Sequence, residues 1–197
     1  GNYKNLGEKS KEELLKMLEK PTSLRQFVMY EALRKGATVE ELYQLTKIKH
    51  YFIEQMQELV EEEEILKQFK GALPEAEIFI HAKKNGFSDK YLSILLELPE
   101  KEVRAYRLSL GVTEAWEPVR VSGTADAAYY YSTYNAPDHS KVTDKPKVMI
   151  LGGGPNRIGQ GIEFDYCCVH AAFALKDLGF ETIIVNCNPE TVSTDYD

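Results

Sequence analysis

Long apolar runs are absent from this sequence of 197 residues, and none approaches the roughly 18 residues that a membrane-spanning helix needs. The first residues, Gly1 to Lys4, also lack the apolar region of a secretory signal peptide. Only three cysteines are present, and two of them (Cys167 and Cys168) are adjacent, which is a poor basis for a disulfide framework. These absences predict a cytoplasmic protein with no membrane partner.

An excess of basic residues is absent as well. Lysine and arginine number 24 against 31 aspartate and glutamate residues, for a net charge of −7. Nucleic-acid binding needs a basic surface that neutralises phosphates. Residues 38–59 have the pattern of a helix-turn-helix, but Glu54 and Glu58 occupy exposed positions of its second helix and would repel phosphate. We therefore expect no nucleic-acid partner.

A metal centre is not predicted either. Cys167, Cys168 and His170 are potential ligands, but adjacent residues point about 100° apart on a helix, and no second ligand pair lies nearby. The sequence favours free thiols buried against a sheet, because unpaired cysteine is often buried. No metal ligand is therefore assigned in this chain.

The first part of the chain has strong helix signals. Capping boxes at Ser10–Glu13 and Thr38–Glu41 precede apolar positions at helical spacing. Longer helices are predicted at about 23–35 and 49–69, and the run Glu61–Glu64 in the second is expected to be a solvated helix face.

This region also repeats itself at an offset of 50 residues. The repeated positions are Ala32, Gly36, Thr38, Leu42, Leu45, Ile48 and Ile53, which recur as Ala82, Gly86, Ser88, Leu92, Leu95, Leu98 and Val103. Stacked helical units of this kind are expected to bury a shared core. We predict a helical domain over residues 1–134, with its core at about 8–115 and an extended tail to 134, followed by a linker at 135–146.

The last part of the chain predicts a βαβ unit. An apolar strand (Val148–Leu151) precedes a glycine-rich loop (Gly152–Gly161), a helix, and a second strand (Thr182–Val185). A parallel strand pair cannot bury both faces alone. Residues 147–197 are therefore interpreted as the first βαβ of a larger α/β domain, cut short. The predicted fold class is an α-helical domain followed by a truncated, Rossmann-like α/β segment.

The two loops that come after these strands are candidates for a binding crevice, because open α/β sheets hold ligands at the carboxyl ends of their strands. The glycine loop could bind phosphate at the helix N-terminus, but it matches neither G-x-G-x-x-G nor the P-loop, and a tight packing turn explains it equally well. Arg157 and Glu163 could line a polar passage or form an ordinary surface pair, and Asp165 is a similar case. The second loop is either another wall of the crevice or a plain turn; its candidate residues are Asn188, Glu190, Thr191, Ser193 and Thr194.

Two long segments carry a resemblance to a known family. Lys147–His170 and Val185–Asp197 resemble the large subunit of carbamoyl phosphate synthetase, at the start of its second half, which phosphorylates carbamate. Residues 31–58 and 82–111 resemble the oligomerisation domain of that family more loosely, and Tyr130–Tyr134 fits it closely. The connector Val121–Ala127 departs from the family pattern by being shorter and lacking Cys-Ala-Ala-Glu-Phe.

The resemblance implies a pre-ATP-grasp segment of an ATP-dependent carbon–nitrogen ligase that makes carbamoyl phosphate, for arginine and pyrimidine synthesis, from bicarbonate, glutamine-derived ammonia and two ATP. It implies a glutamine amidotransferase small subunit as partner and a homo-oligomer through the helical domain. By position, Arg157, Gly161 and Glu163 would line the carbamate tunnel. ATP, Mg²⁺ (or Mn²⁺) and K⁺ would be held elsewhere in the parent enzyme, so the chain has no catalytic residue or cofactor of its own and is expected to be inactive. The alternative is a stand-alone helical interaction module with a nucleotide-binding tail.

Overall fold

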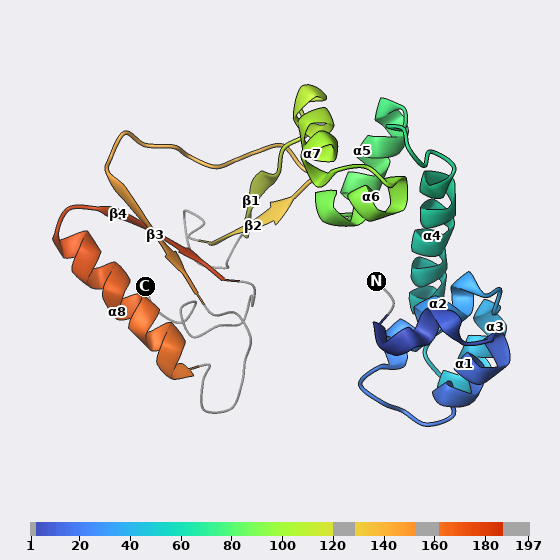
Figure 1. Cartoon of the computed structure of the whole chain (residues 1–197). Coiled ribbons are helices and arrows are strands. Elements are labelled where there is room, and N and C mark those ends of the chain that lie inside the picture. The colour runs from blue at the N-terminus through green and yellow to red at the C-terminus, as the bar shows by residue number, and fades with distance from the viewer. Residues whose placement is uncertain (1–2, 120–128, 153–161, 187–197) are drawn as a thin grey trace. The chain divides into compact units, whose positions relative to one another are not determined.

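A computed structural model of the chain describes residues 3–119, 129–152 and 162–186. The chain forms two compact units, residues 1–114 and 115–197 (Figure 1). The described part of the first unit is helical, and that of the second contains two strand pairs and one helix. The predicted fold class, a helical domain followed by an α/β segment, is confirmed.

The first unit contains a short 3-10 helix and seven α-helices within its described residues. Their bounds are η1 (Tyr3–Glu8), α1 (Lys11–Leu18), α2 (Arg25–Arg34), α3 (Val39–Thr46), α4 (His50–Lys67), α5 (Ala76–Lys84), α6 (Asp89–Leu96) and α7 (Glu100–Ser109). Both predicted capping boxes are formed, by Ser10 with Glu13 and by Thr38 with Glu41. Each box satisfies backbone N–H groups that the first helical turn leaves without partners.

The internal repeat is confirmed in backbone detail. Gly36 and Gly86 both follow a helix with positive φ (84° and 88°), a conformation that glycine adopts without strain. Lys47 and Glu97, also 50 residues apart, both end their helices in the left-handed conformation. The equivalent apolar positions Leu42 and Leu92 are both fully buried. The two copies therefore fold by the same local rules.

The copies do not share one core, however, which corrects the prediction from the repeat. Leu14, Met29 and Leu42 belong to one buried cluster, whereas Phe79, Leu92 and Val103 belong to another. Helix α4 serves both, because Ile53 and Val60 pack in the first cluster and Leu66 packs in the second. A helix of 18 residues is about 27 Å long, which is long enough to carry two separate packing surfaces.

The second unit begins with an antiparallel pair, β1 (Ala115–Val119) and β2 (Tyr129–Thr133). The N–H of Trp116 donates to Asp138 Oδ1 (3.1 Å), and the N–H of His139 donates to the carbonyl of Trp116 (3.0 Å). The predicted linker at 135–146 is therefore bonded to β1. This explains why the structure divides between residues 114 and 115, so that the extended segment to 134 belongs with the second unit and not with the helices.

The predicted βαβ unit is formed. Strands β3 (Lys147–Leu151) and β4 (Glu181–Val185) are parallel, with Met149 opposite Ile183, and helix α8 (Ile162–Asp177) connects them. Cys168, Val169 and Ala172 are buried on α8, whereas Met149, Leu151 and Ile183 are exposed. Helix α8 packs against this strand pair (Figure 1), and no described residue covers the exposed side chains of the strands. Among the helices in the described ranges, none has the length and apolar character to cross a membrane.

Candidate functional site

The candidate crevice lies at the carboxyl ends of β3 and β4, where α8 also begins. Glu163 falls in the first turn of α8, but its side chain is outside the described part of the chain. The other predicted site residues lie outside the described residues altogether: Arg157, Gly161, Asn188, Glu190, Thr191, Ser193 and Thr194. The structure therefore describes the frame from which the two candidate loops leave the sheet.

Two hydrogen bonds among four residues join the ends of these strands and the start of α8. The N–H of Gly152 donates to the carbonyl of Val185 at 2.8 Å, which extends the strand pairing by one residue. The side-chain amide of Asn186 donates from Nδ2 to Asp165 Oδ1 at 3.1 Å. Asp165 is only 4% exposed, so its carboxylate needs such partners. The polar contact therefore joins the end of β4 to the first turns of α8.

For Asp165 the sequence allows a surface pair or a place in a polar passage, and the surface interpretation is wrong. Helical spacing alone does not show which face of α8 packs against the sheet, so the burial of this carboxylate could not be predicted. Asn186 is absent from the predicted site residues; the available signal is a polar amide directly after an apolar strand, in the sequence Val185-Asn186-Cys187.

The predicted thiol burial holds for one cysteine of the pair. Cys168 is buried, and burial, assisted by the negative charge of Asp165, raises the pKa of its thiol. Cys167 is exposed, which corrects the prediction that both would be buried. Neighbouring residues on a helix face different directions, so only one of the two can pack against the sheet. Across residues 3–119, 129–152 and 162–186, no three His, Cys, Asp or Glu side chains group as metal ligands would.

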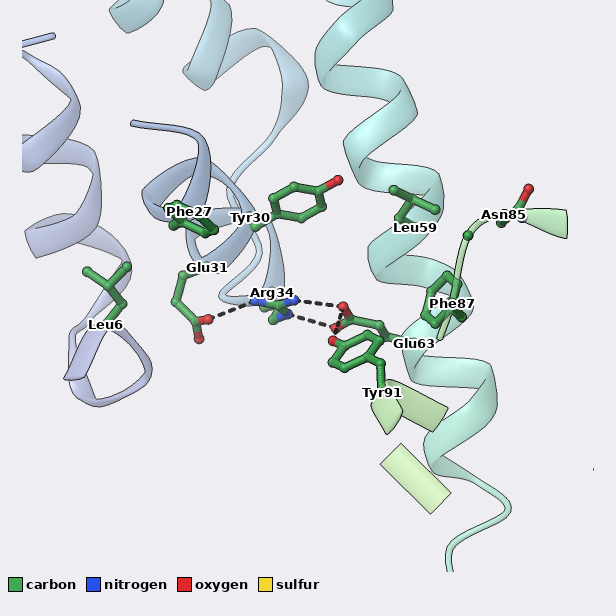
Figure 2. A pocket seen from close by; sticks show the side chains of 11 residues that line it. Leu6, Phe27, Tyr30, Glu31, Arg34, Leu59, Glu63, Asn85, Phe87 and Tyr91 are labelled. Atoms are coloured by element: carbon green, nitrogen blue, oxygen red, sulfur yellow. Dashed lines mark hydrogen bonds and ion pairs between the residues drawn. The ribbon is translucent and has the colours of Figure 1, made fainter. Parts of the chain in front are cut away.

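A second polar feature lies in the helical unit, beside a cavity of about 390 Å³ (Figure 2). Arg34 on α2 donates to both carboxylate oxygens of Glu63 on α4, each at 2.7 Å, and also pairs with Glu31 at 3.0 Å. The hydroxyl of Tyr91 on α6 donates to Glu63 Oε1, which also accepts from Arg34. Glu63 thus connects helices from both copies of the repeat.

The neighbouring Glu62 is buried in the same helix. It accepts from Asn85 Nδ2 at 2.5 Å and contacts His81 Nδ1 at 2.9 Å. The prediction that Glu61–Glu64 is a solvated face is therefore wrong for Glu62 and Glu63, which are 6% and 4% exposed. Helix α4 packs against other helices on two sides, so part of the acidic run turns inward.

The chemistry of the cluster points to a structural role. Burial alone would raise the pKa of Glu63, but the hydrogen bonds from Arg34 and Tyr91 and the charge of Arg34 hold that pKa below its usual range. Burial, with the hydrogen bond and charge of Glu63, raises the pKa of Tyr91. The carboxylate therefore stays ionised and the phenol stays neutral, and neither is prepared to transfer a proton near neutral pH.

The depressed pKa of Glu63 predicts a dependence of stability on pH. A carboxylate whose folded pKa lies below its ordinary value of 4.5 stabilises the fold fully above that value, and this contribution is lost as pH falls through the folded pKa. We expect the urea midpoints of the wild type and Glu63→Gln to differ at pH 7 and to approach each other as the pH falls below 4.5. If the two midpoints differed by the same amount at every pH in this range, the result would contradict a lowered pKa for Glu63.

Comparison with known proteins places these features in a family. Residues 2–111 match the family model described as carbamoyl-phosphate synthetase large chain, oligomerisation domain. Residues 144–197 match the carbamoyl phosphate synthase preATP-grasp domain. The chain belongs to the carbamoyl phosphate synthetase large-chain family. Its repeated helical unit is therefore the oligomerisation domain of that family, and its βαβ unit lies within the preATP-grasp domain.

Individual members of this family are close in sequence. The carbamoyl phosphate synthase large chain of Archaeoglobus fulgidus is 49% identical over 193 residues, which cover 94% of this chain and 18% of that relative. The large chain of Synechocystis is 49% identical over 189 residues (93% of this chain, 17% of the relative), and that of Halomonas eurihalina is 50% identical over 177 residues (88% and 16%). The chain thus spans less than a fifth of the length of these relatives.

Proposed function

We propose that this chain is a segment of a glutamine-dependent carbamoyl phosphate synthetase large subunit, a ligase that uses two ATP, bicarbonate and ammonia from glutamine. The main support is that the oligomerisation and preATP-grasp matches succeed one another along a single chain, as two parts of one large chain. In this proposal the helical unit joins copies of the subunit, and a glutamine amidotransferase small subunit supplies ammonia.

The role proposed for the second unit is to form part of a carbamate tunnel, with Arg157, Gly161 and Glu163 in its wall. Carbamate is unstable in water, so a sequestered path between two active sites serves the reaction. Helix α8 begins at the carboxyl edge of the strands, and the positive end of its dipole favours an anion there. Asn188, Glu190, Thr191, Ser193 and Thr194 would form the second wall.

The open sheet face is consistent with a larger catalytic domain. Met149 is 59% exposed and Leu151 is 70% exposed, although parallel strands are usually covered on both faces. In the full-length protein we propose that further α/β elements cover this face and hold ATP, Mg²⁺ (or Mn²⁺) and K⁺. The nucleotide-binding elements would then lie outside this chain.

A first prediction is that the purified chain alone makes no carbamoyl phosphate. It is given bicarbonate, ammonia, ATP, Mg²⁺ and K⁺, and product is trapped by an ornithine or aspartate transcarbamoylase. We expect product at the level of a protein-free control, because the elements that bind nucleotide are elsewhere. Turnover clearly above that level would contradict the proposal.

A second prediction tests the tunnel in the full-length protein. Glu163→Lys reverses a charge proposed to face the passage, so carbamoyl phosphate formation should fall at least about tenfold, a loss of about 1.4 kcal/mol or more in barrier terms. Bicarbonate-dependent ATP hydrolysis, which precedes the tunnel, should continue. Asp177→Lys is the matched control, since Asp177 is exposed at the opposite end of the same helix. If both variants formed the same amount of carbamoyl phosphate per ATP hydrolysed, the result would count against a place for Glu163 in the tunnel wall.

A further inference from the structure

The contact between Asp165 and Asn186 lies where β3 and β4 end and α8 begins. Gly152 is the last described residue before the glycine loop, and Asn186 is the last described residue before the loop after β4. Asp165 is the fourth residue of α8, immediately after the glycine loop. Asp165 and Asn186 are joined by a hydrogen bond of 3.1 Å, and Gly152 lies against the Asn186 side chain. Side-chain contacts, as well as the strand pairing, therefore hold the ends of β3 and β4 and the start of α8 together.

Gly152 makes this arrangement possible by lacking a side chain. A Cβ placed on Gly152 would lie 3.0 Å from Nδ2 and 3.3 Å from Cγ of Asn186, and 3.1 Å from the carbonyl oxygen of Val185. These distances are tighter than most contacts that a Cβ makes in proteins, so a side chain at position 152 would require Asn186 or Val185 to shift by a few tenths of an ångström. The missing Cβ therefore leaves room for the Asn186 amide beside the end of β3, from which it reaches Asp165.

Asp165 supplies the anchor. Its carboxylate is buried, and a hydrogen bond to an ionised acceptor is stronger than one between neutral groups. It also lies near the N-terminus of α8, where the helix dipole favours a negative charge. An anchored carboxylate fixes the direction of the Asn186 side chain, and with it the backbone from which the second loop continues.

We propose that Asp165 is a positioning residue for carbamate phosphorylation: through Asn186, and with room left by Gly152, it sets how the two crevice loops leave the sheet. This inference rests on the proposed function, because the loops matter to the reaction only if they form the carbamate crevice. Asp165 acts through Asn186 and is not proposed to touch substrate. Small displacements of positioned groups lower turnover strongly, so its loss should affect the catalytic rate more than substrate binding.

The structural half of the inference is tested on this 197-residue chain by amide hydrogen exchange. Asp165→Asn should lower the protection of the Gly152 N–H, which bonds to Val185, by at least tenfold. The Glu181 N–H, which bonds to the Pro146 carbonyl at the other end of the strand pair, should keep its protection. An equal loss at both ends would mean general destabilisation and would overturn the positioning role. Unchanged protection at Gly152 would overturn it as well.

The functional half is tested in the full-length protein by comparing Asp165→Asn, Asn186→Asp and the exchange variant that carries both. Each single variant should form at least tenfold less carbamoyl phosphate per ATP consumed, with the loss in kcat and an unchanged KM for bicarbonate. The exchange variant restores an amide opposite a carboxylate, with the donor now at position 165, and should recover a large part of the coupling. Asp177→Asn, an exposed position on the same helix, should behave as wild type.

The outcomes separate the two proposals. The positioning role would be overturned if Asp165→Asn formed as much carbamoyl phosphate per ATP as the wild type. It would also be overturned if the folded double variant recovered none of this yield. A full-length wild type that makes no carbamoyl phosphate would instead refute the proposed function. The amide hydrogen-exchange measurement at Gly152 would still decide whether Asp165 positions the strand ends.

Discussion

Replacing Glu63 by glutamine is expected to lower the free energy of unfolding of the helical unit by about 2 kcal/mol at neutral pH. The substitution keeps the shape of the side chain but removes the charge that Arg34 and Tyr91 both contact. Arg34 keeps Glu31 as a partner, which limits the loss. Urea unfolding followed by far-UV circular dichroism measures the effect, because the chain's single tryptophan, Trp116, lies outside the helical unit.

The matched control is Glu64→Gln, one residue further along the same helix. The Glu64 side chain is 59% exposed and pairs with Lys67, so its loss should cost at most about 0.5 kcal/mol. If the two glutamine variants unfold at the same urea concentration, Glu63 has no special role and the acidic run is a solvated face after all.

Features that depend on neighbouring residues could be predicted from the sequence. Ser10 and Thr38 cap their helices because the partners are three residues away, and Gly36 and Gly86 end helices because only local backbone geometry is involved. The parallel strands could be predicted for the same reason, since each apolar run is bounded by turn residues and a helix separates them.

Features that depend on distant partners could not be predicted. Glu62 and Glu63 look like Glu61 and Glu64 until Arg34, His81 and Tyr91 are brought to them from other helices. The hydrogen-bond partner of the buried Asp165 is likewise distant in sequence, because Asn186 lies 21 residues away. Repeat sequences show which positions are buried, but they do not show whether two copies bury them together, and for this reason the predicted shared core is wrong. For the candidate loops, the sequence supplies residue types only.

The two separate cores lead to a prediction about paired core substitutions. Leu42 and Leu92 are equivalent in the repeat and both are 0% exposed, so Leu42→Ala and Leu92→Ala should each cost about 3 kcal/mol through lost burial and the cavity that remains. Because Leu42 packs in one cluster and Leu92 in the other, the double variant should lose the sum of the two costs, to within about 0.5 kcal/mol. Urea unfolding of the three variants measures both quantities.

Ile94→Ala is the control for this comparison, because it removes as many carbon atoms as Leu92→Ala from the same helix, at a side chain that is 54% exposed. It should cost at most about 0.5 kcal/mol. A coupling energy of about 1 kcal/mol or more between Leu42 and Leu92 would mean that the copies do share a core. Additivity would mean that α4 joins two independently packed halves, whose mutual orientation then depends on the polar contacts that meet at Glu63 as well as on the helix itself.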